Sequence, residues 1–235
     1  MSSQMIKLEW DTEFFKINCA KLYLSENISA DEWEEYKGKI KEFDFVVIEN
    51  ANCNAEVSRL IGEDTDAFLI DVNIRFRKNP KAVKPLPNIT IENEFKTQPV
   101  LAQITEFEHS RFMNDPELLR RNGKDVYYHW LNNSFNKKES FFAIYRDGET
   151  ILGYILFSYR NNQCILELVN VAKEHSGKGI GSELLKACEN HSFEQKCKEL
   201  IVGTQVKNLN AINFYHKAGF RQISSSEIYH LWVKK

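Results

Sequence analysis

The hydrophobic pattern near the start of the chain changes its period several times. Residues 31–42 carry apolar side chains at helical intervals, whereas the runs 45–48 and 67–74 are short, apolar and rich in β-branched residues. A spacing of three to four residues is typical of a helix that packs one face on a core, and compact apolar runs are typical of buried strands. The front of the chain is therefore predicted to form a small α/β unit.

A longer series of elements is predicted after residue 99. Helical spacing occurs at 100–107 and 126–135, and strand-like runs then dominate. The elements predicted next are strands at 141–145, 150–159 and 164–171, a helix at 180–193, a strand at 200–202, a helix after residue 208 and a strand at 228–233. A meander that changes into strand–helix–strand–helix implies an α/β (α+β) fold, with a mixed, mostly antiparallel sheet flanked by helices.

A proline-rich segment separates the two series. Three of the five prolines lie in residues 79–88, and this segment is too constrained and too poor in N–H donors for a helix or a central strand. We interpret it as a linker. The predicted organisation is an N-terminal α/β domain at 1–78, a linker at 79–88 and a second domain at 89–235.

Composition and charge exclude several classes of protein. The 235 residues are 43% hydrophobic and 27% charged, which is ordinary for a folded globular chain, and the net charge of −2 provides no broad basic field for nucleic acid or anionic membranes. Lys7 and Glu9 stand where the apolar core of a secretion signal would lie, and no run approaches the ~18 apolar residues of a membrane span. We expect a cytoplasmic protein that binds neither nucleic acid nor membranes.

The cysteine content also fits the expected cytoplasmic location. There are five, an odd number, widely spread and without a CxxC pair. Such a pattern fits reduced thiols better than disulfides or a structural zinc site, because those need paired or clustered cysteines. The sequence therefore predicts no metal site.

A glycine cluster between a predicted strand and a predicted helix is the first candidate for chemistry. Gly177, Gly179 and Gly181 fall within five residues, just before the helix at 180–193. Free N–H groups and the macrodipole at a helix N-terminus attract anions, and glycines let the backbone approach phosphate oxygens. The spacing matches neither the P-loop nor the dinucleotide fingerprint. Phosphate binding by another kind of motif, or tight strand–helix packing alone, would explain the cluster.

Two polar residues follow about thirty positions later. Asn208 directly precedes a predicted helix, where it could cap the helix or bind a ligand. Tyr215 lies two turns into that helix, on the side that faces the sheet, where it could belong to the core or contact whatever enters between the strands.

Together these segments resemble a known superfamily. Residues 171–185 (VAKEHSGKGIGSELL) and 208–220 (NLNAINFYHKAGF) resemble the two signature motifs of the GNAT N-acetyltransferases, with Ser176 where that family usually has Gln or Arg. The resemblance implies a GNAT fold with a splayed central strand pair, acetyl-CoA as co-substrate and Tyr215 facing the sulfur. The residues it implies for acetyl-CoA binding are Val169, Asn170, Val171, Ser176, Gly177, Lys178, Gly179, Ile180, Gly181, Ser182 and Asn208.

Other segments resemble a narrower group. Residues 8–18 (LEWDTEFFKIN), 109–112 (HSRF) and 128–131 (YHWL) are similar to sugar-nucleotide N-acetyltransferases of the TDP-fucosamine type. This resemblance implies a TDP-linked 4-amino-4,6-dideoxyhexose as acceptor, a role in the biosynthesis of surface polysaccharide such as lipopolysaccharide O-antigen, and a homodimer.

The implied reaction is direct attack of a neutral amine on the thioester carbon. A backbone N–H around 169–171 would polarise the carbonyl, and Tyr215 would act as the catalytic acid that protonates the departing thiolate. Glu167, His109 and His129 are candidate bases on chemical grounds alone, with water as an alternative.

Four residues are candidates for the acceptor site. Arg111 could pair with the nucleotide diphosphate, because its planar fork suits phosphate, or it could form a surface ion pair. Phe112, Tyr127 and Trp130 could stack on the base or the hexose, or belong to the core.

Two other functions fit the same motifs. The chain could acetylate a peptide N-terminus, a lysine or a small amine, for which a cleft lined with carboxylates would be expected. It could also be a non-catalytic regulator that binds acyl-CoA, although such a module needs no acid at the sulfur.

Overall fold

The computed structural model describes residues 2–84, 87–93, 109–135 and 137–233. The helix predicted at 100–107 lies outside these residues. The strands are β1 (Gln4–Lys7), β2 (Cys19–Leu24), β3 (Phe45–Ala51), β4 (Phe68–Lys78), β5 (Ile89–Glu92), β6 (Ser140–Asp147), β7 (Thr150–Arg160), β8 (Gln163–Val171), β9 (Glu199–Gln205) and β10 (Arg221–Trp232). The α-helices are α1 (Glu9–Phe15), α2 (Ala30–Ile40), α3 (Ala55–Asp64), α5 (Arg111–Asn114), α6 (Pro116–Arg120), α7 (Val126–Ser134), α8 (Ile180–Glu194) and α9 (Leu209–Lys217).

The described strands form one mixed sheet. Their order is β1-β2-β3-β10-β4-β9-β8-β7-β6-β5, in which β2–β3 and β8–β9 are parallel pairs and the other pairs are antiparallel. Helices pack on both faces of this sheet. The prediction of a mixed, mostly antiparallel sheet flanked by helices is therefore confirmed. None of the helices in the described ranges is long and apolar enough to cross a bilayer.

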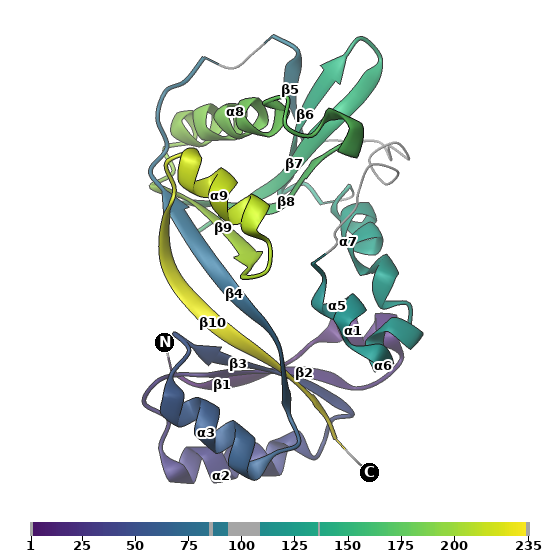
Figure 1. The fold of residues 1–235 in the computed structure, drawn as a ribbon, viewed down its shortest axis with the longest axis vertical. Helices are drawn as coiled ribbons and strands as arrows, with labels where there is room; N and C mark the ends of the chain where they lie inside the picture. Colours follow the sequence, from purple (N-terminus) through teal and green to yellow (C-terminus); the bar gives the residue numbers. More distant parts are fainter. Residues whose placement is uncertain (1, 85–86, 94–108, 136, 234–235) are drawn as a thin grey trace.

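Two long strands connect the front of the chain to the rest. Figure 1 shows β4 and β10 running side by side from the part of the sheet that carries α8 and α9 down to the part that carries α2 and α3. The last strand, β10, pairs with both β3 and β4, and β4 pairs with β9. The division into domains at 79–88 stays a prediction, and three strand pairings cross it, namely β3–β10, β4–β10 and β4–β9.

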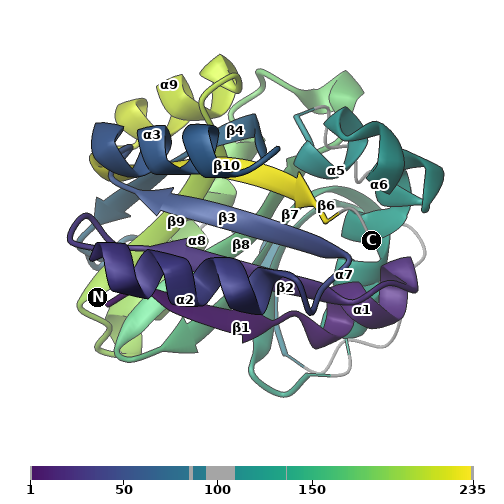
Figure 2. The ribbon, with the colours of Figure 1, turned by 90° about the horizontal axis from the view of Figure 1, so that it is seen from below.

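Strand β3 explains why the front unit has two cores. Its residues alternate, so that Val46 and Ile48 face the cluster made with α2 and α3, whereas Phe45 and Val47 face the cluster made with α1, α5, α6 and α7. A strand whose side chains are buried on both faces reads as a continuous apolar run, as 45–48 does. The view from below in Figure 2 shows α2 lying along β1 and β2, with α5 and α6 gathered near the C-terminus.

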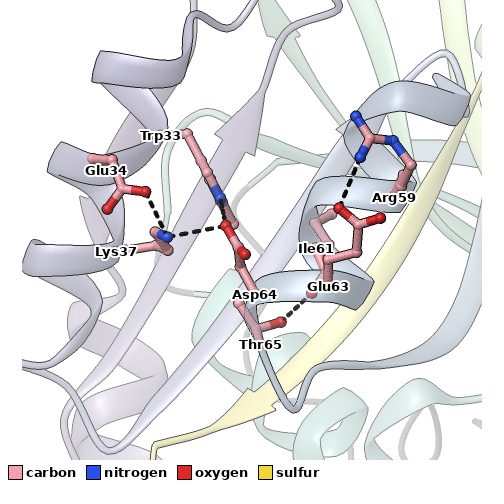
Figure 3. Close-up of polar contacts among 8 residues, drawn as sticks. All are labelled: Trp33, Glu34, Lys37, Arg59, Ile61, Glu63, Asp64 and Thr65. Carbon is pink, nitrogen blue, oxygen red and sulfur yellow. Dashed lines mark hydrogen bonds and ion pairs between the residues drawn. The ribbon is translucent and has the colours of Figure 1, made fainter.

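Helices α2 and α3 are joined by a polar contact (Figure 3). Trp33 is 2% exposed, and its indole N–H donates to the Asp64 carboxylate over 2.6 Å, while Lys37 Nζ lies 3.0 Å from the same oxygen. A buried indole N–H needs an acceptor, and Asp64 at the end of α3 supplies it. The contact fixes the spacing of the two helices over the sheet.

The other half of the sheet is also covered on both faces. Helices α8 and α9 pack on one face around Phe76, Phe157 and Val202, and α7 packs on the opposite face through Leu131 against Leu156. All five cysteines are free thiols.

Candidate active site

The parallel strands β8 and β9 pair over part of their length only. Their ladder runs from Gln163–Glu199 to Leu166–Val202 and stops there, while β8 continues to pair with β7 as far as Val171. The register of β8 on β7 shifts around Glu167, which is the extra residue of a β-bulge. Beyond the bulge, β8 and β9 separate. The β8 backbone groups that face β9 are there outside the ladder between these strands and can bind a ligand.

A cleft of about 590 Å³ opens where the strands separate. It is lined by the end of β8, the loop before α8, the end of β9 and the first turns of α9. Of the residues predicted for acetyl-CoA, those that line it are Val169, Asn170, Val171, Ser176, Gly177, Gly179, Ile180, Gly181, Ser182 and Asn208. Lys178 is not among the lining residues, and its Nζ lies 3.4 Å from His175 Nδ1.

The glycine turn delivers the N-terminus of α8 into this cleft. Gly177 and Gly179 have φ of +77° and +85°, a region that favours glycine, and an added Cβ would meet nothing within 4 Å. The N–H groups of Ser182 and Glu183 donate to the Gly179 carbonyl, as in a normal first turn. The N–H groups at the start of the helix then have no acceptor within it, and together with the helix dipole they suit a diphosphate.

Helix α9 begins at the other side of the cleft. The Asn208 side-chain oxygen accepts a hydrogen bond from the Ala211 N–H at 3.1 Å, which confirms its capping role. Asn208 also lines the cleft, so its amide N–H groups can donate to a ligand. The two roles proposed for this residue are compatible, and contact with the cofactor arm stays a prediction.

Tyr215 closes the apolar floor of the cleft. It is 4% exposed, its ring centroid lies 5.7 Å from those of Phe76 and Phe220, and it is among the lining residues. Burial raises the pKa of the Tyr215 hydroxyl well above its usual value. The hydroxyl is therefore protonated at neutral pH and able to give a proton to a thiolate.

The end of the cleft away from the glycine turn is lined by Glu167, Tyr127, His109 and Gln205. Glu167 accepts hydrogen bonds from Ser158 Oγ at 2.5 Å and from Trp130 Nε1 at 3.3 Å. Among the lining residues that the structure describes, Glu167 is the only carboxylate. We call this the acceptor end.

The remaining sequence candidates lie at different depths. Trp130 is 38% exposed beside Glu167, whereas Phe112 is 7% exposed and has the Arg111 guanidinium 4.2 Å above its ring. Arg111, Phe112 and Trp130 are all absent from the lining residues, although Trp130 contacts the lining residue Glu167. His129 is exposed and packs on Phe14, with ring centroids 5.1 Å apart, also outside the lining.

Sequence reasoning missed part of the lining. Lys173, His175, Thr204, Gln205, Asn210 and Phe214 line the cleft without having been singled out. Each of these residues lies close to a recognised motif, before the glycine turn, at the end of β9 or in α9. Closeness to a motif is the sequence feature that could have identified them. Tyr127, one of the aromatic residues considered for the acceptor site, does line the cleft, and its stacking on an acceptor stays a prediction.

Comparison with known proteins agrees with this geometry. The family profile described as "Acetyltransferase (GNAT) family" matches residues 102–220. The chain is 30% identical over 129 residues to the spore coat polysaccharide biosynthesis protein SpsD of Bacillus subtilis (strain 168), covering 55% of this chain and 45% of SpsD. An uncharacterized N-acetyltransferase of Methanocaldococcus jannaschii is 39% identical over 83 residues, covering 34% of this chain and 52% of that protein. The chain thus spans about half the length of these curated relatives.

A solved structure shows the same fold. The GCN5-related N-acetyltransferase from Sphaerobacter thermophilus aligns with a TM-score of 0.64 over 100% of this chain and 78% of that chain, at 12% sequence identity.

Proposed function

The chain belongs to the GNAT family of acetyltransferases, and from this premise we propose that it is an acetyl-CoA-dependent enzyme whose acceptor is the 4-amino group of a TDP-linked 4-amino-4,6-dideoxyhexose. One observation carries the proposal: the separation of β8 from β9 joins the anion-binding turn, a buried tyrosine and an acceptor end in one cleft. Reaction by direct transfer requires both substrates in such a shared space.

The cleft residues fit acetyl-CoA by the chemistry of their donors. The backbone from Gly177 to Ser182 would hold the diphosphate, and the edge of β8 at 169–171, beyond the end of its ladder with β9, would hydrogen-bond the pantetheine arm. Asn208 would contact the arm from α9. When bound, acetyl-CoA supplies the activated acyl group as a thioester.

The protein's part in the transfer is to position, polarise and move protons. The amine nitrogen forms a bond to the thioester carbon, and the carbon–sulfur bond breaks. A β8 backbone N–H near 169–171 stabilises the charge that develops on the carbonyl oxygen, and Tyr215 donates its proton to the sulfur. The amine loses a proton to water or to Glu167, the carboxylate at the acceptor end.

Two observations support an anionic sugar nucleotide as acceptor. The acceptor end is lined by a single carboxylate, Glu167, among the described residues, whereas a polyamine or a lysine would favour a cleft lined with several carboxylates. SpsD, which the chain resembles over about half of its length, is named for spore coat polysaccharide biosynthesis. A role in surface polysaccharide or O-antigen synthesis, a cytoplasmic location and a homodimer are parts of the same proposal.

A competition between acceptor classes tests the proposal. The protein is incubated with acetyl-CoA and, separately, TDP-4-amino-4,6-dideoxyhexoses of both epimers, spermidine, and a lysine-containing peptide, and thiol release is followed. We expect the highest kcat/KM with one TDP-sugar. A preference for spermidine or the peptide would replace the proposed acceptor with a cationic amine. Binding of acetyl-CoA without transfer to any acceptor would instead favour the non-catalytic regulator.

A further inference from the structure

A fully buried histidine links the last strand to the helices beside the cleft. His230 on β10 is 0% exposed, and its Nδ1 lies 2.7 Å from Asp115 Oδ2. Asp115 is 1% exposed and also accepts from Trp232 Nε1 at 3.0 Å. A carboxylate can only accept, so His230 donates through Nδ1 and its Nε2 carries the lone pair. Arg111 Nη1 donates to that Nε2 at 3.0 Å.

The contact continues from Arg111 to the acceptor end. The Arg111 guanidinium covers the Phe112 ring at 4.2 Å, and Phe112 meets Tyr127 edge-on with centroids 6.1 Å apart. Tyr127 is stacked on Trp130 at 6.2 Å and 11°, and Trp130 donates to Glu167. We call this series, from Asp115 through His230, Arg111, Phe112 and Tyr127 to Trp130, the buried stack. Tyr127 lines the cleft, and Trp130, the last member of the series, lies outside the lining but donates to Glu167, which lines it.

Electrostatics shows why Arg111 depends on this series. It forms no ion pair with a carboxylate in the part of the chain that the structure describes, although Asp11, Asp71 and Asp115 act on it from a greater distance. Burial lowers the pKa of the Arg111 guanidinium, so the charge is costly where it stands. The Arg111 guanidinium is held by its hydrogen bond to the neutral His230 imidazole and by its contact with the face of the Phe112 ring.

Tyr127 is held from several sides. Ser110, Gln205, Arg111 and Asp71 all lie near enough to its hydroxyl to influence its pKa, which burial raises. Gln205 belongs to β9, so the ring spans from the α5–α7 helices to the strand that borders the cleft. The orientation of Tyr127, and with it that of Trp130, therefore depends in part on Ser110, Arg111 and Phe112, which lie outside the cleft lining.

We propose that the buried stack positions Tyr127 and Trp130 as an aromatic wall that takes the pyranose ring of the acceptor, with Arg111 and His230 as positioning residues. The assignment of a sugar rests on the proposed function. A flat aromatic face with a carboxylate beside it suits the apolar face and the amine or hydroxyl groups of a hexose. Trp130 offers 38% of its surface and Glu167 lies against its indole N–H.

Steady-state kinetics, with the KM measured for each of the two substrates, tests the proposed aromatic wall. Arg111→Met and His230→Gln are expected to raise the KM for the TDP-sugar by about tenfold or more, since a small misplacement at a reacting site is costly, while the KM for acetyl-CoA stays unchanged. Arg111→Lys retains the charge without the planar fork and is expected to fall between these variants and wild type. Asp64→Asn, which weakens the distant α2–α3 contact, controls for lost stability and should change neither KM.

The positioning claim has its own readout, independent of any acceptor. In protein labelled with 3-fluorotyrosine, the Tyr127 ¹⁹F resonance, assigned with Tyr127→Phe, should shift in Arg111→Met and His230→Gln but not in Asp64→Asn. An unshifted resonance in both variants would overturn the stack as a positioning device. A shifted resonance with equal effects on both KM values would overturn the acceptor wall. If wild type acetylates no TDP-sugar, the proposed function fails while the resonance still decides the positioning claim.

Discussion

Tyr215 shows how one side chain serves both the core and the chemistry. Its ring packs among Phe76 and Phe220, and its position in the cleft lining places a protonated hydroxyl where the strands separate. The sequence left core and catalytic roles as alternatives for this residue, and the structure shows that burial is compatible with a role as acid. Burial raises the pKa of the hydroxyl further above neutrality, so it stays protonated over the neutral range.

Replacing Tyr215 with Phe removes the proposed acid and keeps the ring packing. We expect turnover to fall by roughly 10²–10⁴-fold, the range of general acid catalysis, with acetyl-CoA affinity retained. Steady-state rates and calorimetric titration with acetyl-CoA would check this. A turnover within a few-fold of wild type would exclude Tyr215 as the acid and leave protonation of the thiolate to water.

The pH profile offers an independent check on the same hydroxyl. Because the pKa of Tyr215 is raised, the hydroxyl stays protonated across the neutral range and should give no alkaline loss of kcat below about pH 10, its unperturbed value. An alkaline limb near neutrality that disappears in Tyr215→Phe would contradict the raised pKa.

At the scale of elements, the sequence predicted the helices and strands whose ends and buried faces are determined by neighbouring residues. The helix at 31–42 has a capping box, with Ser29 accepting from the Glu32 N–H and Glu32 accepting from the Ser29 N–H, and the structure places it at Ala30–Ile40. The short edge strands β1 and β5 gave no clear pattern, because four residues contain too few alternations. The candidate cofactor residues were found because they are contiguous, whereas the buried stack joins His230 to Asp115 across 115 positions.

The glycine turn can be tested against a matched glycine elsewhere. Gly179 and Gly148 both have positive φ, +85° and +57°, and open space around a built Cβ. Gly179→Ala and Gly148→Ala should each destabilise the fold by about 1–2 kcal/mol, the cost of a left-handed non-glycine residue. Only Gly179→Ala should raise the KM for acetyl-CoA severalfold, because it lies in the anion-binding turn. Equal KM values in the two variants would remove the turn from the cofactor site.

At the scale of the molecule, β10 carries a titratable group into the centre of the fold. Burial lowers the pKa of His230 from 6.5 to about 4, with the Asp115 hydrogen bond opposing part of the shift. The unfolded chain therefore takes up a proton between these values while the folded chain does not. This difference stabilises the unfolded state, so folding stability is complete above about pH 6.5 and falls as the pH drops toward 4.

His230→Gln should reduce that dependence on pH. The wild-type free energy of unfolding should lose up to about 3 kcal/mol more than that of the variant between pH 7 and pH 4, by the linkage of a shift of this size. Asp11 and Asp71, whose pKa values are raised by burial, act in the opposite direction in both proteins, so the difference between the proteins reports on His230 and the Asp115 carboxylate that it contacts. Urea unfolding at several pH values measures it. Parallel curves would show that His230 is not buried as a neutral ring.

The central claim is that the cleft transfers acetyl from acetyl-CoA to an amino sugar held at its acceptor end. Its most direct test is the product made from acetyl-CoA and a TDP-4-amino-4,6-dideoxyhexose by wild-type protein, identified by mass and by NMR. We expect one added acetyl group, in amide linkage at the 4-nitrogen. An unmodified sugar under conditions in which acetyl-CoA binds would contradict the claim.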